Sequence, residues 1–338
     1  MNMNKINSLY YLRAISAVLI LLYHYTTRFG DSLYGMNLEL KHEGLWWGSN
    51  AVYTFFILSG FLIVLSCKNK SAKEFALKRF FRLYPVYWVC IIITTIVTIL
   101  FLPNRFIGIK DTCINFTMFQ FWLGAKSVDG AYWTLQYELL FYAAIWLVLI
   151  LKKIDVLDIL SLLVLLFVFI EKTLILIYGD QGGFHIVDSV FNNIFLAEYA
   201  HVFISGISLS FLLKGIRLKL NCFNLLICCV IQFALNGLYR TIFFMLILLL
   251  ILTLVFSNFK LKHDKALITL SEISYALYLL HQFVGNYSRY YLIEHYHIGY
   301  YVSFIIVTSF VVALAYSIHR LIEIPLNNKM KRYFSKYE

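Results

Sequence analysis

Charged residues are scarce in this chain. Asp, Glu, Lys and Arg make up 14% of its 338 residues, while hydrophobic residues make up 61%. Soluble domains have about a quarter charged residues and less than half apolar ones, so this composition excludes an ordinary soluble protein and indicates an integral membrane protein. Proline and glycine are also few, at 3 and 16 residues, which leaves no room for a long flexible linker. We therefore expect a single membrane domain over residues 1–338.

Signatures of other protein classes are missing as well. The six cysteines have no zinc-site spacing, so we expect neither a metal nor a disulfide framework. No glycine-rich phosphate loop and no GxSxG motif occurs, which argues against an ATP-driven pump and a serine hydrolase. No small-residue cleavage site follows the first apolar stretch, so we interpret it as a membrane span. The net charge of +11 is better explained by membrane topology than by nucleic-acid binding.

Ten apolar stretches are long enough to cross a bilayer, which takes about 20 helical residues. They lie near residues 7–28, 45–66, 83–102, 132–151, 157–178, 194–214, 220–236, 238–257, 270–292 and 299–322. Lys and Arg gather in alternate loops and in the C-terminal tail, and such residues mark the cytoplasmic side. We therefore predict an all-α, polytopic protein with about ten transmembrane helices and both termini in the cytoplasm. The seventh and eighth stretches meet at Asn236–Gly237, a turn dipeptide.

Two ionisable residues, Arg13 and His24, interrupt the first apolar stretch. Such residues are costly in a membrane and indicate a functional site. Eleven helical steps of about 100° return to within roughly 20° of the start, so both side chains share one helix face, about 16 Å apart along the axis. This layout favours a long ligand that runs along the helix. An imidazole ordinarily titrates near neutral pH, so His24 is a candidate general base.

A basic segment precedes the third apolar stretch. Ser71 and Glu74 have capping-box spacing, and we predict a basic interfacial helix over residues 67–82. Arg79 and Arg82 are neighbours on that helix, and two guanidinium groups side by side suit phosphate. The simpler alternative is an anchor to anionic lipid.

Glu138 lies inside the fourth stretch, at a predicted depth near that of His24. A carboxylate in a membrane usually has a partner, so we predict that Glu138 orients His24. Trp133 precedes it and is either an interfacial belt residue or a platform for a sugar ring.

Two further segments carry ionisable residues in the ninth and tenth stretches. His281 falls at middle to outer depth. Glu323 lies near the cytoplasmic end, where it either pairs with Arg13 or belongs to the donor site.

These segments, taken in order, resemble the acyltransferase 3 family of membrane O-acyltransferases. The motifs that carry the resemblance are Arg13 and His24 with ten residues between them, FFILSGFLI over 55–63, Arg79 and Arg82 before YPVYW over 84–88, WTLQYELLFY over 133–142, SYALYLLH over 274–281 and EIP over 323–325. One departure is that Gln136 and Tyr137 precede Glu138, where the family often has another acidic residue. The chain resembles members without an extracytoplasmic esterase-like domain.

The resemblance implies a bacterial inner-membrane enzyme. It would transfer an acetyl group from acetyl-CoA to a hydroxyl of an envelope glycan, an O-antigen or a related surface polysaccharide. The phosphate-rich head of coenzyme A would dock at the cytoplasmic face, and its arm would run up the first helix. The expected roles are: catalytic, His24, Glu138 and Arg13; donor-binding, Arg79, Arg82, Tyr84 and Arg13; acceptor-binding, Trp133 and His281; structural, Ser59, Gly60, Glu323 and Pro325.

Alternatives remain at this stage. His24 either takes a proton from the attacking hydroxyl or accepts the acetyl group covalently before transfer. A different function is transport or flipping of a lipid-linked glycan or a small solute, because transporters also contain buried His, Arg and Glu. A non-catalytic scaffold in glycan assembly is a third reading, and it predicts that His24 is dispensable.

Overall fold

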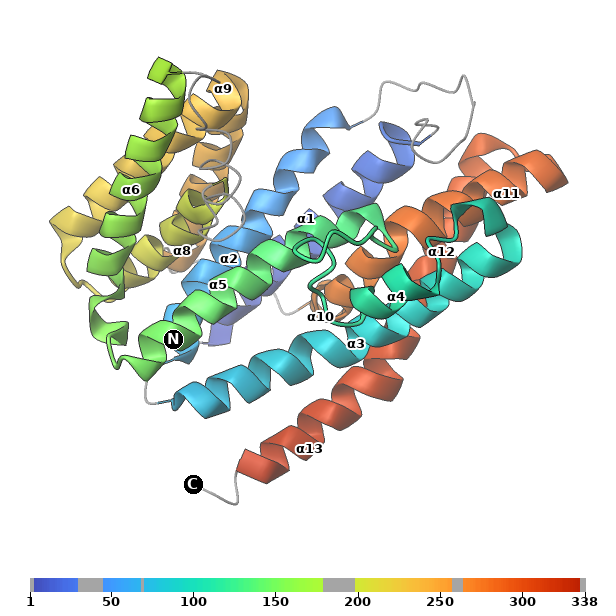
Figure 1. Cartoon of the computed structure of the whole chain (residues 1–338), viewed down its shortest axis with the longest axis horizontal. Coiled ribbons are helices and arrows are strands. Elements are labelled where there is room, and N and C mark those ends of the chain that lie inside the picture. The colour runs from blue at the N-terminus through green and yellow to red at the C-terminus, as the bar shows by residue number, and fades with distance from the viewer. Residues whose placement is uncertain (1–2, 30–44, 68–69, 179–197, 257–263, 335–338) are drawn as a thin grey trace. The chain divides into compact units, whose positions relative to one another are not determined.

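The computed structural model describes residues 3–29, 45–67, 70–178, 198–256 and 264–334. Within these ranges every regular element is a helix, which confirms the all-α prediction (Figure 1). The longer helices are α1 (Met3–Thr26), α2 (Val52–Ser66), α3 (Ala72–Phe101), α4 (Ile109–Asn115), α5 (Trp133–Ile150), α6 (Leu157–Tyr178), α8 (Ala200–Leu213), α9 (Leu218–Phe256), α10 (Lys265–Leu280), α11 (Asn286–Tyr296), α12 (Tyr300–Ile318) and α13 (Ile324–Phe334). The short single-turn elements are η2 (Trp46–Ala51), η3 (Pro103–Arg105), η4 (Gly130–Tyr132), η5 (Ile154–Val156), η7 (His281–Gly285) and η8 (His319–Glu323).

The chain divides into two compact units. Unit 1 comprises Met1–Leu9, Val52–Ala76 and Tyr137–Lys262, and unit 2 comprises Tyr10–Ala51, Leu77–Gln136 and His263–Glu338. In unit 1, α8 packs against α2, α6 and α9. In unit 2, α12 packs against α10 and α11.

Six helical segments in the described ranges are long and apolar enough to cross a membrane. They are Trp46–Ser66, Ala72–Phe101, Gly130–Ile150, Leu218–Val255, Lys265–Tyr296 and Tyr300–Phe334. The protein therefore has the helices of an integral membrane protein. The count of ten spans and the cytoplasmic termini stay predictions. The segment between the fifth and sixth predicted stretches, residues 179–193, lies outside the described residues.

The turn expected at Asn236–Gly237 is present. Residues 218–256 form one long helical segment, but Gly237 has φ 74 and ψ 177, which is not helical. A positive φ strains residues with a Cβ atom, so glycine suits this position. The seventh and eighth predicted stretches are thus two helices separated at Gly237.

The basic segment is not a separate helix. Residues 68 and 69 lie outside the described residues, and α3 begins at Ala72, where the Glu74 amide donates to the Ser71 hydroxyl over 3.1 Å, as the capping pattern predicts. The helix then continues past residue 82 and through Pro85 to Phe101. The helix does not end at Pro85, although proline lacks an N–H group and often ends a helix. The donor-binding candidates Arg79, Arg82 and Tyr84 therefore share one continuous helix with the third apolar stretch.

Glycines allow α2 and α8 to approach closely in unit 1. A Cβ atom on Gly60 would lie 2.0 Å from the Phe203 carbonyl oxygen, and one on Gly206 would lie 2.0 Å from the Ile57 carbonyl oxygen. Helices in membranes associate through such small residues because lipid offers no hydrophobic driving force between them.

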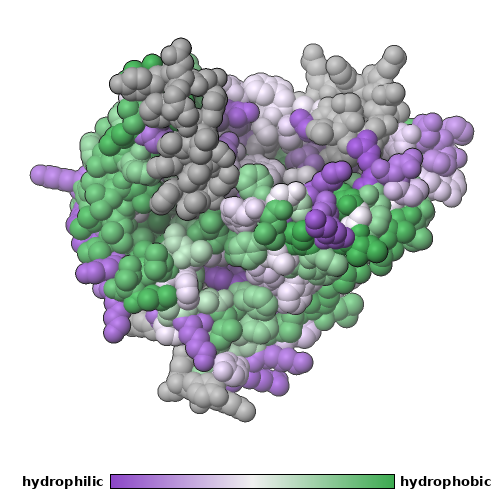
Figure 2. Space-filling model, viewed as in Figure 1, coloured by the Kyte–Doolittle hydropathy of each residue, from purple (hydrophilic) through white to green (hydrophobic). Residues whose placement is uncertain are grey.

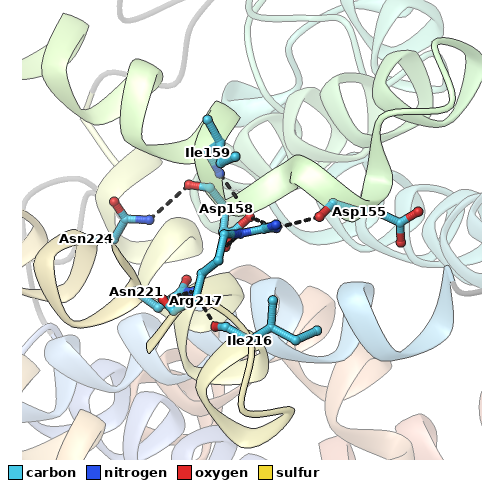
Figure 3. Close-up of polar contacts among 7 residues, drawn as sticks. All are labelled: Asp155, Asp158, Ile159, Ile216, Arg217, Asn221 and Asn224. Carbon is cyan, nitrogen blue, oxygen red and sulfur yellow. Dashed lines mark hydrogen bonds and ion pairs between the residues drawn. The ribbon is translucent and has the colours of Figure 1, made fainter. Parts of the chain in front are cut away.

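A polar network ties the start of α6 to the start of α9 in unit 1 (Figure 3). The Asp158 carboxylate is fully buried and accepts hydrogen bonds from the Arg217 guanidinium at 2.5 and 2.7 Å and from the Asn221 amide at 3.0 Å. The Asn224 amide donates to the Asp158 carbonyl over 3.0 Å. The charge of Asp158 is therefore paired, as a buried charge requires.

Large apolar side chains remain exposed on α6 and α9. Those more than half exposed include Leu163, Ile170, Leu226, Leu246 and Leu249. Figure 2 shows broad hydrophobic areas on its visible face. In a soluble protein such surfaces would promote aggregation, so their extent agrees with contact to lipid tails.

The close packing of α2 and α8 yields a test of the fold. Gly60→Ala forces a methyl group against the Phe203 backbone, and overpacking of this kind costs about 1–3 kcal/mol. We expect a lower melting temperature in detergent. Unfolding is measured by the labelling of buried cysteines such as Cys67 and Cys228.

Gly299→Ala is the matched control, because Gly299 has φ −57 and open space around it. Equal melting temperatures for both variants would contradict the close approach of α2 and α8.

Candidate active site

Helix α1 carries Arg13 and His24, as the sequence predicts. It is continuous from Met3 to Thr26, so the two residues lie on one helix three turns apart. Both side chains are half-buried. Both also belong to unit 2.

His24 contacts a second histidine, His281, in the same unit. The Nε2 atom of His281 lies 3.2 Å from the Nδ1 atom of His24, and the ring centroids are 4.7 Å apart in an edge-to-face arrangement. Each Nδ1 atom also faces a carbonyl oxygen, that of Ile20 at 2.9 Å for His24 and that of Tyr278 at 2.6 Å for His281. We expected His281 to contact the acceptor, and the structure brings it to the candidate base.

A buried carboxylate holds the segment that carries His281. His281 starts η7, a single π-helical turn, and such turns are frequent at functional sites. The Asp129 side chain is 1% exposed and accepts hydrogen bonds from the Ala131 amide at 2.8 Å and from the Phe283 amide at 2.9 Å. The Tyr278 hydroxyl donates to the Ala131 carbonyl over 2.9 Å. These bonds fix the start of η4 against the turn that presents His281.

The C-terminal turn of α1 is capped by side chains from α11 and α12. The last carbonyls of a helix have no partner within the helix. The Asn286 amide donates to the His24 carbonyl over 3.3 Å, and the Arg289 guanidinium donates to the Tyr25 carbonyl. The Tyr300 hydroxyl also donates to the Tyr25 carbonyl, over 3.3 Å. The backbone that carries His24 is therefore held on its C-terminal side.

Arg289 itself is fully buried. Its guanidinium lies 4.0 Å from the ring centroids of both Phe29 and Tyr300 and 5.3 Å from that of Phe304. It also donates to the Tyr300 carbonyl over 3.1 Å and to the Ser303 hydroxyl over 3.4 Å. Aromatic faces and the negative end of α1 stabilise this cation.

Glu138 has partners inside unit 1. The Tyr142 hydroxyl donates to its carboxylate over 2.5 Å, and the Ser59 hydroxyl lies 3.5 Å away. Ser59 and Gly60 therefore lie on the part of α2 near Glu138 and α8. His24 belongs to unit 2, so its orientation by Glu138 stays a prediction.

Arg79 and Arg82 lie one turn apart near the start of α3, both half-buried, in the same unit as His24. Lys78 lies 5.1 Å from the centroid of the Phe334 ring at the end of α13. Because α13 also exposes Lys331, two basic segments meet at this end of unit 2.

Two aromatic candidates of unit 2 have defined surroundings. The Tyr84 hydroxyl donates to the Thr117 carbonyl over 2.9 Å, and its ring stacks on Phe80. Trp133 is 39% exposed at the first turn of α5. Tyr84 thus anchors a loop, whereas Trp133 has surface left for a ligand.

Glu323 contacts a histidine on its own helix. Its carboxylate lies 2.8 Å from the Nδ1 atom of His319, within the π-helical turn η8. Pro325 follows in the first turn of α13. The pairing of Glu323 with Arg13 stays a prediction.

Sequence reasoning missed several sets of buried polar residues, Asp158 with Arg217 among them. Arg289 and His201 are ionisable residues inside predicted spans, a signal that could have identified both. The His201 Nε2 atom lies 2.6 Å from Gln232 Oε1, and the Gln232 amide donates to the Tyr53 hydroxyl over 3.1 Å in unit 1. Asp129 gave no such signal, because it resembles an ordinary loop residue. Within the described ranges, no three His, Cys, Asp or Glu side chains come together as metal ligands.

The fold and the site define an integral membrane protein with a hydrogen-bonded pair of histidines, in which His281 is buried and His24 is half-buried. The family model described as an acyltransferase domain, Acyl_transf_3, matches residues 6–320. The chain therefore belongs to the acyltransferase 3 family, and the resemblance read from its motifs is confirmed. No curated protein and no solved structure matches the chain.

The burial of Asp129 predicts a dependence of stability on pH. Burial raises the pKa of Asp129 from 3.8 to about 7. Its contribution to stability is therefore full below pH 3.8 and is lost as the pH rises through about 7. We expect the melting temperature of the wild type to fall between about pH 5 and pH 8 more steeply than that of Asp129→Asn.

Asp155→Asn, at an exposed carboxylate, serves as the control and should follow the wild type. Parallel curves for the wild type and Asp129→Asn would show that Asp129 does not titrate in this range.

Proposed function

We propose that this membrane acyltransferase moves an acetyl group from cytoplasmic acetyl-CoA to a hydroxyl of an envelope glycan, an O-antigen or related surface polysaccharide, in the bacterial inner membrane. The observation that carries the proposal is the placement of His24. Its imidazole is half-buried on the helix that also carries Arg13, and a second histidine holds it. Family membership supports acyl transfer as the reaction class.

In the proposed reaction His24 acts as a general base. It takes the proton from the acceptor hydroxyl while the hydroxyl oxygen forms a bond to the thioester carbon. The carbon–sulfur bond breaks, and the leaving thiolate receives the proton from the His24 imidazolium. The products are an O-acetyl ester and a free thiol, and His24 returns to its neutral form.

Arg79 and Arg82 are proposed to bind the phosphates of the donor. Two guanidinium forks one turn apart present several donors in a fixed geometry. Lys78 and the exposed Lys331 of α13 add positive charge at this end of unit 2. Arg13 lies about 16 Å before His24 along α1 and is proposed to guide the donor arm toward the base.

Glu138 is retained as the proposed orienting group of His24 on the strength of the sequence pattern. Tyr84 is proposed to lie at the edge of the donor site, and Trp133 to contact the acceptor sugar. The covalent route through an acetyl-His24 intermediate is the alternative mechanism. Labelled acetyl groups trapped on the protein without acceptor would favour it.

The proposal predicts that His24→Ala abolishes acetylation. NMR of surface glycan from cells with the wild type should show an O-acetyl signal, and cells with His24→Ala at equal membrane levels should lack it. The spectrum would also identify the acetylated sugar and position.

His295→Ala, at an exposed histidine of α11, is the control and should keep the signal. Equal acetylation in cells with the wild type and in cells with His24→Ala would exclude His24 as the base. Unacetylated glycan in the wild type would favour a transporter or flippase.

The donor site gives a second prediction. Arg79→Lys and Arg82→Lys keep the charge but lose the guanidinium fork, and hydrogen bonds to charged groups contribute about 1.5–3 kcal/mol. We expect the KM for acetyl-CoA to rise by about tenfold or more in each variant, measured with labelled donor in membrane vesicles.

Arg105→Lys, at an exposed arginine outside this segment, should leave the KM unchanged. A transporter that uses these residues only as positive charges would tolerate all three changes.

A further inference from the structure

We propose that His281 is a positioning residue that holds His24 in the tautomer with its hydrogen on Nδ1, so that Nε2 is the nitrogen that takes the hydroxyl proton. This inference rests on the proposed function, in which His24 is the base. It assigns His281 a role different from the acceptor contact that the sequence predicts.

The assignment begins with the hydrogen on His281. Its Nδ1 atom lies 2.6 Å from the Tyr278 carbonyl oxygen. A carbonyl oxygen only accepts hydrogen bonds, so Nδ1 of His281 carries the hydrogen. In a neutral imidazole the other nitrogen is then an acceptor. Nε2 of His281 therefore presents a lone pair to its neighbour.

The neighbour is the Nδ1 atom of His24, which faces two acceptors. The Ile20 carbonyl oxygen lies at 2.9 Å and Nε2 of His281 at 3.2 Å. Both contacts are favourable only if Nδ1 of His24 carries a hydrogen. Its Nε2 atom is then the unprotonated nitrogen, which carries the lone pair that can accept a proton. The arrangement thus selects which nitrogen of His24 can act as the base.

The same contact stabilises the charged form of His24 during the reaction. When Nε2 takes the hydroxyl proton, Nδ1 keeps its hydrogen and its bond to the His281 lone pair. A bond from a charged donor is stronger than one from a neutral donor. The interaction therefore strengthens as the imidazolium forms, which is how a group accelerates a chemical step. The proton then passes from Nε2 to the leaving sulfur.

His281 is held well enough to serve this purpose. It is 1% exposed, and the turn that it starts is fixed by the Phe283 amide bond to Asp129. A histidine satisfied in the core would need only its bond to the Tyr278 carbonyl. The second nitrogen, aimed at His24, is what indicates a role in the site.

The test compares His281→Gln with His281→Leu in the full-length protein. The Gln amide oxygen can replace Nε2 as the acceptor, whereas Leu has none. We expect kcat within about threefold of the wild type for Gln and a loss of about tenfold or more for Leu, since general-base catalysis contributes 10²–10⁴-fold. The KM for acetyl-CoA should be unchanged in both. His295→Leu is the control for substitution at an exposed histidine.

A second readout does not depend on activity. In ¹⁵N-histidine spectra at about pH 8, the His24 signals, assigned by their loss in His24→Gln, should show a protonated Nδ1 and an unprotonated Nε2. The opposite tautomer, or equal kcat for His281→Gln and His281→Leu in stably folded proteins, would overturn the inference. If the wild type shows the expected tautomer but transfers no acyl group, the proposed function is overturned and only the hydrogen-bond assignment remains.

Discussion

The hydrogen bonds that Asp129 accepts from two separate backbone segments are the constraint on which the candidate site depends. A carboxylate that is 1% exposed must find donors inside the protein. It finds the amides of Ala131 and Phe283, which belong to elements about 150 residues apart in the chain. Their common acceptor fixes the π-helical turn that begins with His281. The position of the His281 imidazole, 3.2 Å from His24, therefore depends on how one buried carboxyl group is satisfied.

The features that the sequence predicted correctly are those that depend on local order along the chain. Arg13 and His24 share a helix because nothing between them breaks the helical pattern. The Ser71 cap and the break at Gly237 follow from turn and capping preferences of single residues. The family could be recognised for a related reason, since its motifs are short runs in a fixed order.

The contacts that join distant segments could not be predicted in this way. The partner of His24 lies more than 250 residues away, and only helix packing decides which polar groups meet. Asp129 carried no signal because an acidic loop residue is ordinary until the loop is buried. The basic helix was expected to end near residue 82, but α3 continues, because one missing N–H at Pro85 is outweighed by the apolar run that follows. Depth in the membrane suggested Glu138 as a partner of His24, and that pairing stays a prediction.

The way Arg289 holds α1 has a consequence for the environment in which the site works. Its partners are the carbonyls of Tyr25 and Tyr300, the Ser303 hydroxyl and three aromatic rings. These partners include no carboxylate. A carboxylate in the same place would release the helix end in acid. The attachment of the helix that carries His24 therefore does not depend on an ionised acid, whereas the turn that carries His281 is held by the carboxyl group of Asp129.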